Sequence, residues 1–289
     1  MLTYDVVDVF TDRPYAGNPL AVVHGGAELT AGQMQRIAGE FNLSETVFPL
    51  PPTTSGADYR ARIFTPSREM PFAGHPSIGV AWVLARAGLI GPGDVVQECG
   101  AGLLPVHVTG YGAQVTGGAP EVGPPLDGVA LAAAVGLAPE DVDTAVPAGI
   151  AGAGAPFAFL AVGPDAVTRA VPDPAAVRAL TEGLIGLVVV AYDAGGSAAH
   201  MRMFAPGSGV AEDPATGSAA VALGVFLVDR GVIAAAGQTG FLASQGAELG
   251  RPSQLGVLVH AQDGAALRAS VWGNVAAVAR GELLALPGE

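Results

Sequence analysis

Two carboxylates and one histidine stand where apolar segments of the chain begin. Glu45 precedes TVFPL, His75 lies in AGHPSIG, and Asp213 precedes PATGSAAVALG. A glutamate held in an apolar cleft has a raised pKa, in the range useful for proton transfer, and a neutral imidazole can carry a proton. A second carboxyl group opposite such a glutamate is a familiar acid/base arrangement. These three residues are the candidates for acid/base catalysis; the alternatives are a solvated loop glutamate for Glu45 and helix capping for His75 and Asp213.

Four further residues are candidates for binding a small polar substrate. Asn18 stands in GNPLAVV, where it could hydrogen-bond a substrate or form an ordinary turn. Gly74 and Gly217 begin two apolar helical patterns, and the unpaired N–H groups at a helix start suit an anion such as a carboxylate. Ser218 could bind a ligand or end a turn, and no base close to it in sequence would make it a nucleophile.

Composition excludes several other kinds of chemistry. All 13 basic residues are arginine, so a lysine Schiff base and the usual attachment of pyridoxal phosphate are excluded. Cys99 is the one cysteine, which rules out an internal disulfide, a CxxC redox pair and a pair of cysteine acid/base groups. The five histidines show no metal-ligand spacing such as HExxH, and residues 246–253 lack the strand-then-helix setting of a dinucleotide site. We therefore expect neither a metal nor a cofactor.

Charge and hydropathy exclude two classes of partner. The formal net charge is −13 and no basic patch is visible, which argues against nucleic-acid binding. No apolar run approaches the length needed to span a bilayer, and the N-terminal residues lack the basic start of a secretory signal. We expect a cytoplasmic protein that binds no nucleic acid and no membrane.

An internal repeat organises the elements that must position these residues. Residues 61–90 resemble residues 201–233: the matching positions are Arg62-x-Phe64-x-Pro66 with Arg202-x-Phe204-x-Pro206, then Gly74 with Gly217 and Gly88 with Gly231. In both segments the alternation before the proline predicts a strand, and the small and aliphatic run after the first glycine predicts a buried helix. The two arginines are either structural partners or residues that line a cleft.

The repeat predicts an α+β protein of two related lobes that face each other across an active-site cleft. Each lobe contains a strand, a loop and a buried central helix, with more strands around it. The other predicted elements are strands at 2–10, 18–24, 45–50, 58–65, 156–162, 185–192, 199–205, 239–245, 255–260 and 267–273, and helices at 30–41 and 173–182. We expect residues 1–118 with 276–289 to form one lobe and residues 119–275 the other, with the Gly- and Pro-rich segment 118–128 as a linker.

Taken together, several motifs resemble the PhzF family of phenazine-biosynthesis-like proteins. These motifs are DVFTDRPYAGNPLAVV, LSETVFPL, RIFTPSREMPFAGHPSIG, RMFAPGSGVAEDPATGSA and QGAELGRPS, and they cover nearly the whole chain in the family's order. The resemblance implies the diaminopimelate epimerase-like fold, in which each lobe wraps a mostly antiparallel, barrel-like sheet around its central helix. It also implies a homodimer.

The resemblance further implies a cofactor-independent isomerase. In the related epimerases, a cysteine from each lobe acts at the start of the central helix, but here the matching positions are Ala73 and Thr216. The family's glutamate proton shuttle is matched by Glu45, with His75, Asp213 and Ser218 around the substrate. The implied reaction moves a proton between carbons of a small carboxylate, as in the isomerisation of trans-2,3-dihydro-3-hydroxyanthranilate. The alternatives are a racemase or epimerase of a small amino or hydroxy acid, and a binding protein without turnover.

Overall fold

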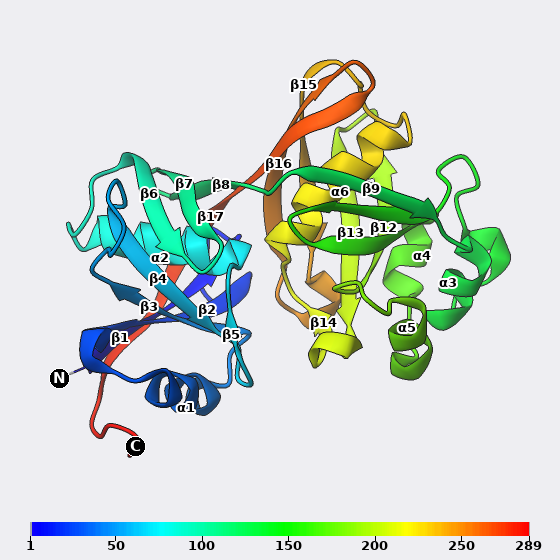
Figure 1. Ribbon diagram of the computed structural model, residues 1–289. Helices are drawn as coiled ribbons and strands as arrows, with labels where there is room; N and C mark the ends of the chain where they lie inside the picture. The colour runs from blue at the N-terminus through cyan, green and yellow to red at the C-terminus, as the bar shows by residue number, and fades with distance from the viewer. Residues whose placement is uncertain (1, 289) are drawn as a thin grey trace. The chain divides into compact units, whose positions relative to one another are not determined.

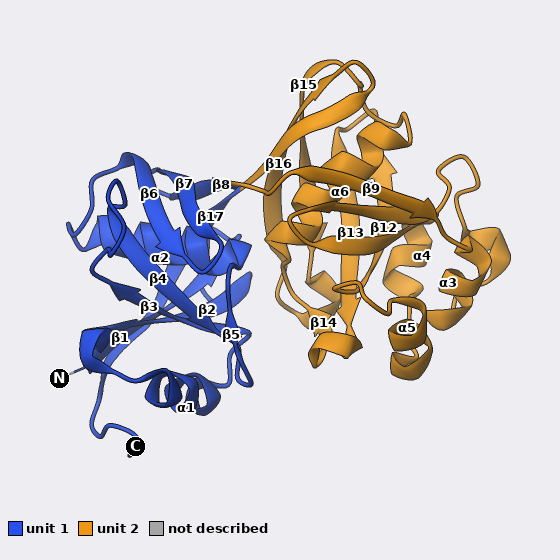
Figure 2. Cartoon of the chain, viewed as in Figure 1, with its two compact units in different colours: residues 1–115, 272–289 blue, residues 116–271 orange. Residues whose placement is uncertain are grey.

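We analysed a computed structural model that describes residues 2–288 (Figure 1). The chain divides into two compact units (Figure 2): unit 1 comprises residues 1–115 and 272–289, and unit 2 comprises residues 116–271. The chain passes from unit 1 to unit 2 and back again, so the N- and C-terminal segments belong to the same unit. From the sequence we predicted these boundaries at 118/119 and 275/276.

Unit 1 is a closed ring of strands around one helix. Its elements are β1 (Leu2–Val9), β2 (Asn18–His24), η1 (Gly26–Glu28), α1 (Ala31–Phe41), β3 (Glu45–Leu50), β4 (Tyr59–Phe64), β5 (Glu69–Met70), α2 (Gly74–Arg86), β6 (Gly93–Cys99), β7 (Gly102–Val108) and β8 (Gly112–Thr116). Neighbouring strands pair in the order β17–β1–β2–β3–β4–β6–β7–β8, and the pairing of β8 with β17 (Ala265–Leu283) closes the ring. Helix α2 packs against β1, β2, β3, β4 and β7.

Unit 2 repeats this plan with added helices. Its elements are β9 (Pro120–Pro125), α3 (Gly128–Ala134), η2 (Pro139–Asp141), β10 (Gly149–Ala153), β11 (Pro156–Ala161), α4 (Pro164–Arg169), α5 (Pro174–Leu180), β12 (Leu187–Asp193), β13 (Ala198–Ala205), η3 (Pro206–Ser208), β14 (Val210–Asp213), α6 (Gly217–Asp229), β15 (Gly237–Gln245), η4 (Ala247–Leu249) and β16 (Ser253–Gln262). Helix α6 packs against β9, β10, β11 and β16. Both units therefore have the predicted α+β architecture of a sheet wrapped around a central helix.

The repeat found in the sequence extends to the whole order of strand pairing. In unit 1 the pairs β1–β2, β2–β3, β3–β4 and β4–β6 are antiparallel, parallel, antiparallel and parallel. In unit 2 the pairs β10–β11, β11–β12, β12–β13 and β13–β15 show the same alternation. The hairpins β4–β5 and β13–β14 each lead into a central helix.

The central helices are buried because their sequences offer almost no polar face. Every residue of α6 from Ala219 to Val228 is buried, as is every residue of α2 from Gly74 to Ala81. A helix that is apolar nearly all round must be covered on all sides, which a closed or strongly curved sheet achieves. Helix α1, by contrast, is amphipathic: Thr30 caps it with a capping box, and it buries Met34, Ile37 and Ala38 only.

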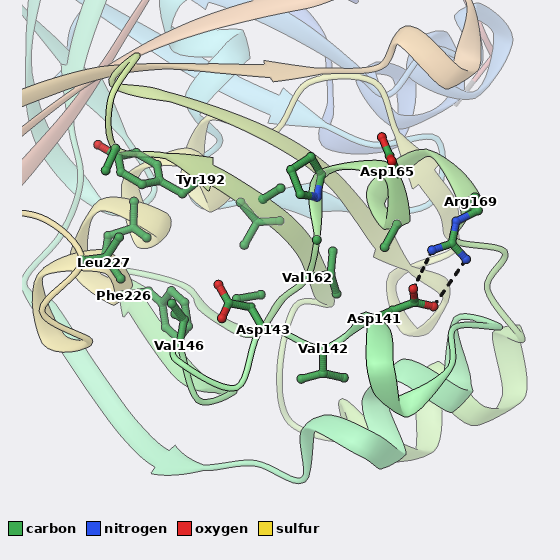
Figure 3. Close-up of a pocket in the computed structure, with 18 of the residues that line it drawn as sticks. Asp141, Val142, Asp143, Val146, Val162, Asp165, Arg169, Tyr192, Phe226 and Leu227 are labelled. Carbon is green, nitrogen blue, oxygen red and sulfur yellow. Dashed lines mark hydrogen bonds and ion pairs between the residues drawn. The ribbon is translucent and has the colours of Figure 1, made fainter.

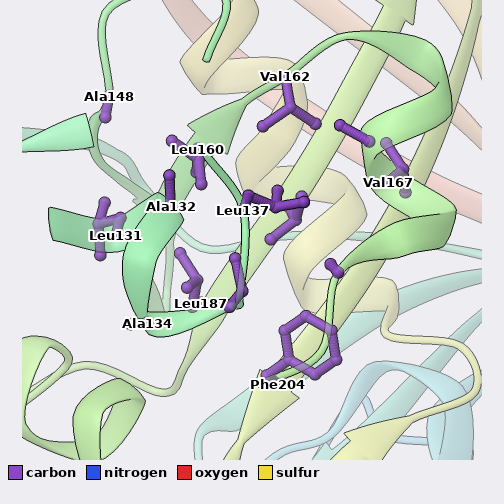
Figure 4. Packing of buried hydrophobic residues seen from close by; sticks show 14 of the residues in the cluster. Leu131, Ala132, Ala134, Leu137, Ala148, Leu160, Val162, Val167, Leu187 and Phe204 are labelled. Carbon is purple, nitrogen blue, oxygen red and sulfur yellow. The ribbon is translucent and has the colours of Figure 1, made fainter. Parts of the chain in front are cut away.

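In unit 2 an apolar cluster, separate from the core around α6, fills the space between the sheet and the three short helices. It joins Leu131 of α3 and Val167 of α4 to Leu160, Leu187 and Phe204 on neighbouring strands (Figure 4). Val177 of α5 belongs to the same cluster. Figure 1 shows these helices together at one side of the unit. The cluster explains why unit 2 keeps α3, α4 and α5 folded although each has only six or seven residues.

The segment that we expected to be a linker is partly a strand. Residues 120–125 form β9, which pairs with β10, where Ala151 lies opposite Val122. Prolines occupy the first position and the last two positions of β9, at the ends of the strand, where a missing N–H costs a sheet least. A high content of glycine and proline was therefore a poor guide at 118–128, because pairing with β10 outweighs the local preference for a loop.

Candidate functional site

Unit 1 brings three of the predicted residues to one end of its sheet. Strands β2 and β3 are parallel neighbours, and they begin at Asn18 and Glu45 respectively. Helix α2 packs against both strands, and His75 lies in its first turn. Parallel strands present their first residues at the same edge, so these side chains converge there.

The most informative contact in this group is between His75 and Glu45. The Nε2 atom of His75 lies 3.3 Å from Oε2 of Glu45, and the side chains are 6% and 17% exposed. Burial lowers the pKa of His75 from 6.5 to about 3, although a hydrogen bond with the Pro19 backbone opposes this shift. The imidazole is therefore neutral at physiological pH.

The partner at Pro19 determines which ring nitrogen of His75 carries the hydrogen. Proline has no backbone N–H, so its carbonyl can only accept a hydrogen bond. Within residues 2–288, Nε2 makes no hydrogen bond of good geometry, which leaves Nδ1 as the donor to Pro19. A neutral ring has one N–H, so Nε2 is the acceptor nitrogen and faces Glu45.

Unit 2 holds the remaining predicted residues around the start of α6. Asp213 ends β14, and α6 begins at Gly217 after a three-residue connection. Ser218 is only partly buried, unlike residues 219–228, which follow it in the helix. The Asp213 carboxylate accepts a hydrogen bond of 2.5 Å at Oδ2 from the hydroxyl of Thr216.

Both central helices begin without a side-chain cap among the described residues. The residue before α2 is Ala73, which has no polar side chain, and Thr216 uses its hydroxyl to contact Asp213 instead of a helix N–H. Each helix has 13 residues and presents its first N–H groups and positive dipole end there. Gly74 and Gly217 thus stand where the backbone can bind an anion.

The two repeated arginines have structural partners. Arg62 forms a two-pronged ion pair with Glu69, and both of its hydrogen bonds are 2.7 Å long. Arg202 forms the equivalent pair with Glu212, with two bonds of 2.8 Å, and also donates to backbone carbonyls at the end of α4. Each arginine therefore links the two strands of the hairpin that precedes a central helix.

Sequence analysis assigned no role to Gln245, Gly246 and Ser253. Gln245 is 1% exposed, donates to the carbonyl oxygen of Asp213 and accepts from the N–H of Thr216. Ser253 donates to the carbonyl oxygen of Pro214. The signal was a glutamine and a glycine at the end of an alternating strand, in QGAELGRPS, a motif that entered only the family resemblance and the exclusion of a dinucleotide site.

Unit 2 also contains a cavity of about 510 Å³ that includes none of the predicted residues. It lies beside the start of α4 and the end of α6, with Tyr192, Asp143 and Phe226 among its lining side chains (Figure 3). The ion pair of Asp141 with Arg169 closes one side, and the hydrogen bond from Arg169 lowers the pKa of Asp141.

The described residues contain neither a metal-binding cluster nor a membrane-spanning helix. Between residues 2 and 288, no three or more His, Cys, Asp or Glu side chains are arranged to hold a metal ion. None of the helices in that range is long and apolar enough to cross a membrane.

Comparison with known proteins identifies relatives along nearly the full length. The sequence profile of the family described as phenazine biosynthesis-like protein (PhzC-PhzF) matches residues 7–281. An uncharacterized isomerase of Mesorhizobium japonicum is 37% identical, covering 97% of this chain and 98% of the relative. The trans-2,3-dihydro-3-hydroxyanthranilate isomerase of Pseudomonas chlororaphis is 33% identical, covering 97% of this chain and 99% of that enzyme.

A solved structure agrees with these sequence matches. The phenazine biosynthesis protein of the PhzF family from Bacillus anthracis superposes with a TM-score of 0.88 at 26% identity. The match covers 98% of this chain and 99% of the other.

Proposed function

The chain belongs to the phenazine biosynthesis-like (PhzC-PhzF) family and is an isomerase of that family, and we propose that Glu45 is the acid/base group that moves the proton. The substrate is a small carboxylate, and the reaction transfers a proton from one of its carbons to another without a cofactor. The observation that carries the proposal is the buried contact of 3.3 Å between Glu45 and a neutral His75.

In this mechanism Glu45 cycles between carboxylate and carboxylic acid. The carboxylate takes a proton from a C–H bond of the substrate, and the electron pair of that bond is delocalised into the substrate's conjugated system. The carboxylic acid then returns the proton, or one exchanged with solvent, to a different carbon. No net charge is gained or lost, and no oxidant or reductant takes part.

His75 has a defined part in this cycle. Its Nε2 atom is the acceptor nitrogen and faces Glu45, so it can accept a hydrogen bond from Glu45 once that group is protonated. A neutral acceptor stabilises the acid form of the glutamate without itself taking a charge. His75 thereby favours the intermediate in which the enzyme holds the substrate's proton.

The remaining predicted residues act in binding. Asn18 and Ser218 supply polar side chains, and Gly74 and Gly217 supply N–H groups at helix starts for the substrate carboxylate. Asp213 orients the substrate's polar groups. We also propose a homodimer, as the resemblance to the family implies. A homodimer predicts twice the chain mass of 28.6 kDa in light scattering, whereas the monomer mass at micromolar concentration would overturn it.

Deuterium exchange tests the proposal directly. The protein is incubated in D₂O with trans-2,3-dihydro-3-hydroxyanthranilate and a panel of small carboxylates, and deuterium entry is followed by NMR. Wild type should exchange or isomerise a substrate, and Glu45→Gln should lose this activity. Glu40→Gln is the matched control, because Glu40 is an exposed residue of α1 in the same unit.

The alternatives give different results in the same assay. Exchange that survives Glu45→Gln would remove Glu45 from the mechanism. Loss of optical rotation in an amino or hydroxy acid would indicate a racemase or epimerase instead. Ligand-induced thermal stabilisation without any exchange would indicate a binding protein.

A further inference from the structure

A buried chain of hydrogen bonds in unit 1 ends at the start of α2. It begins at the hydroxyl of Tyr59 on β4, passes through the side-chain amide of Gln97 on β6 and the hydroxyl of Ser77 in α2, and ends on the carbonyl oxygen of Ala73. The three bonds are 3.1, 2.9 and 2.9 Å long. Tyr59, Gln97 and Ser77 are 4%, 0% and 0% exposed, so water does not compete for these bonds.

The direction of these hydrogen bonds follows from the last acceptor. A carbonyl oxygen can only accept, so the Ser77 hydroxyl donates to Ala73, and its oxygen accepts from Nε2 of Gln97. Oε1 of Gln97 then accepts from the hydroxyl of Tyr59. Burial raises the pKa of Tyr59, so this hydroxyl keeps its hydrogen at physiological pH.

The carbonyl of Ala73 belongs to the same peptide unit as the N–H of Gly74. A peptide unit is planar, and in its trans form the C=O and N–H bonds point in opposite directions. Every peptide bond between residues 2 and 288 is trans. Whatever holds the Ala73 oxygen therefore also determines where the Gly74 N–H points.

The Ser77 hydroxyl is the closer of two donors to this oxygen. The backbone N–H of Ser77 also donates to it, but at 3.3 Å, against 2.9 Å for the hydroxyl. In unit 2 the matching residue is Ala220, which has no hydroxyl, and its backbone N–H donates to the carbonyl of Thr216 at 3.0 Å. The first backbone bond of α2 is thus longer, and the side chain of Ser77 supplements it.

Both units place a buried glutamine beside the start of the central helix. β6 and β15 are corresponding strands of the repeat, since each pairs in parallel with the strand before the helix, β4 or β13. β6 supplies Gln97, and β15 supplies Gln245, which is 1% exposed and accepts from the N–H of Thr216. The same side chain recurs with different contacts, which associates it with the helix start and not with one particular neighbour.

A second feature marks the start of α2 as a place where a molecule binds. His75, in the same turn as Gly74, is 6% exposed, and its Nε2 atom has no hydrogen-bond partner of good geometry among residues 2–288. Buried polar atoms normally have such a partner. The helix also begins there without a side-chain cap from the described residues. A buried nitrogen and uncapped N–H groups in one turn suit a polar ligand.

We propose that Ser77, Gln97 and Tyr59 are positioning residues for the anion-binding start of α2. They fix the plane of the peptide between Ala73 and Gly74, and so direct the Gly74 N–H at the substrate carboxylate. This inference rests on the proposed function, which assigns the substrate carboxylate to the helix starts.

Steady-state kinetics distinguish positioning from a structural role. Ser77→Ala removes the hydroxyl that holds the Ala73 oxygen, so the Gly74 N–H should bind the carboxylate less well in the ground state and the transition state alike. We expect KM for deuterium exchange to rise about 10-fold, the low end of what a hydrogen bond to a charged group contributes. The value of kcat should stay within about twofold of wild type, because uniform binding is lost. Gln97→Met should change KM in the same direction.

Thr181→Val is the matched control for Ser77→Ala. Thr181 is buried, and its hydroxyl also donates to the carbonyl four residues earlier, but at the end of α5 in unit 2. This variant should keep the KM of wild type.

Two kinetic outcomes would overturn the inference. One is a Ser77→Ala enzyme with the KM of wild type and an unchanged kcat. The other is a lower kcat with an unchanged KM, because a purely structural residue reduces the amount of folded enzyme and leaves the binding of substrate to the remainder as it was.

The second test needs no substrate, so it distinguishes failure of this inference from failure of the proposed function. Urea unfolding is measured for Ser77→Ala, Gln97→Met and the double variant. Ser77→Ala leaves Nε2 of Gln97 without its acceptor, and Gln97→Met removes that group, so the double variant should lose less stability than the two single variants together. Additive losses would overturn the inference even if no substrate is found. Coupled losses support the chain, and if exchange is then absent the failure lies in the proposed function.

Discussion

His75 and Glu45 are in contact through Nε2 and Oε2, 3.3 Å apart, at one end of the unit 1 ring. The contact joins the first turn of α2 to the first residue of β3, two elements separated by the β4–β5 hairpin. It places a neutral acceptor beside the carboxylate that we propose as the proton carrier.

The buried imidazole should make the stability of the protein depend on pH. The folded state holds His75 with a pKa of about 3, against 6.5 in the unfolded chain. As pH falls from 6.5 toward 3, the unfolded chain binds a proton that the folded protein does not, so stability is lost in that window at up to about 1.4 kcal/mol per pH unit. His75→Gln should flatten this slope in urea unfolding between pH 4.5 and 7.

The comparison for that experiment is His107→Gln, which removes an exposed histidine from the same unit. An unchanged slope in His75→Gln would contradict a buried neutral imidazole.

Shortening the proposed proton carrier should slow the reaction without abolishing binding. Glu45→Asp withdraws the carboxylate by one methylene, about 1.5 Å, and a misplacement of about 1 Å can cost about 100-fold in rate. We expect kcat for deuterium exchange to fall by about that factor, with little change in KM. A wild-type rate in Glu45→Asp would mean that the position of this carboxylate does not matter.

The two repeated arginines should differ in their contribution to stability. Arg202→Met leaves Glu212, 11% exposed, and the carbonyls at the end of α4 without their donor, which should cost about 3–5 kcal/mol. Arg62→Met leaves Glu69, 41% exposed, and should cost about 1 kcal/mol or less. Urea unfolding at pH 7 measures both losses, and equal losses would refute the assignment of Arg202 as a buried anchor.

Alanine substitutions at two glycines of the same loop should distinguish the cost of backbone strain from the cost of a steric clash. Gly246 and Gly250 have φ values of +79° and +70°, so alanine at either position costs about 1–2 kcal/mol in strain. A side chain at Gly250 meets nothing, whereas at Gly246 it meets two carbonyl oxygens. We expect Gly246→Ala to lose about 1–3 kcal/mol more than Gly250→Ala in thermal unfolding, and to lose exchange activity as well. Equal effects would show that the loop moves freely away from Pro214.

The repeat was predictable from the sequence because burial leaves a strong periodic signal. Arg62-x-Phe64-x-Pro66 and its counterpart predicted a strand and a buried helix in each half, and the structure has β4 with α2 and β13 with α6. The strands from 18–24 and 45–50 have the predicted bounds. Helix α1 was predictable for a similar local reason, its Thr30 cap and amphipathic pattern.

Other strands left no such signal. β10 is GIAGA, five residues of which four are glycine or alanine, and it is a strand because β9 and β11 pair with it on either side. β17 runs from Ala265 to Leu283, far beyond the predicted 267–273, because β1 pairs with residues 275–283. Pairing between segments distant in sequence decided these elements.

The sequence by itself determined which side chains are candidates for acid/base chemistry, namely Glu45, His75 and Asp213, and that the chain has no lysine and one cysteine. Only the tertiary structure decided that Nε2 of His75 faces Glu45 and that Gln97 reaches the start of α2 through the hydroxyl of Ser77. The physical reason is that these sequence signals are local, whereas the contacts join segments that are distant in the sequence. Residue type and periodicity report burial and local backbone preference, whereas a hydrogen bond requires two atoms from distant segments to meet within about 3 Å, and only the completed packing brings them there.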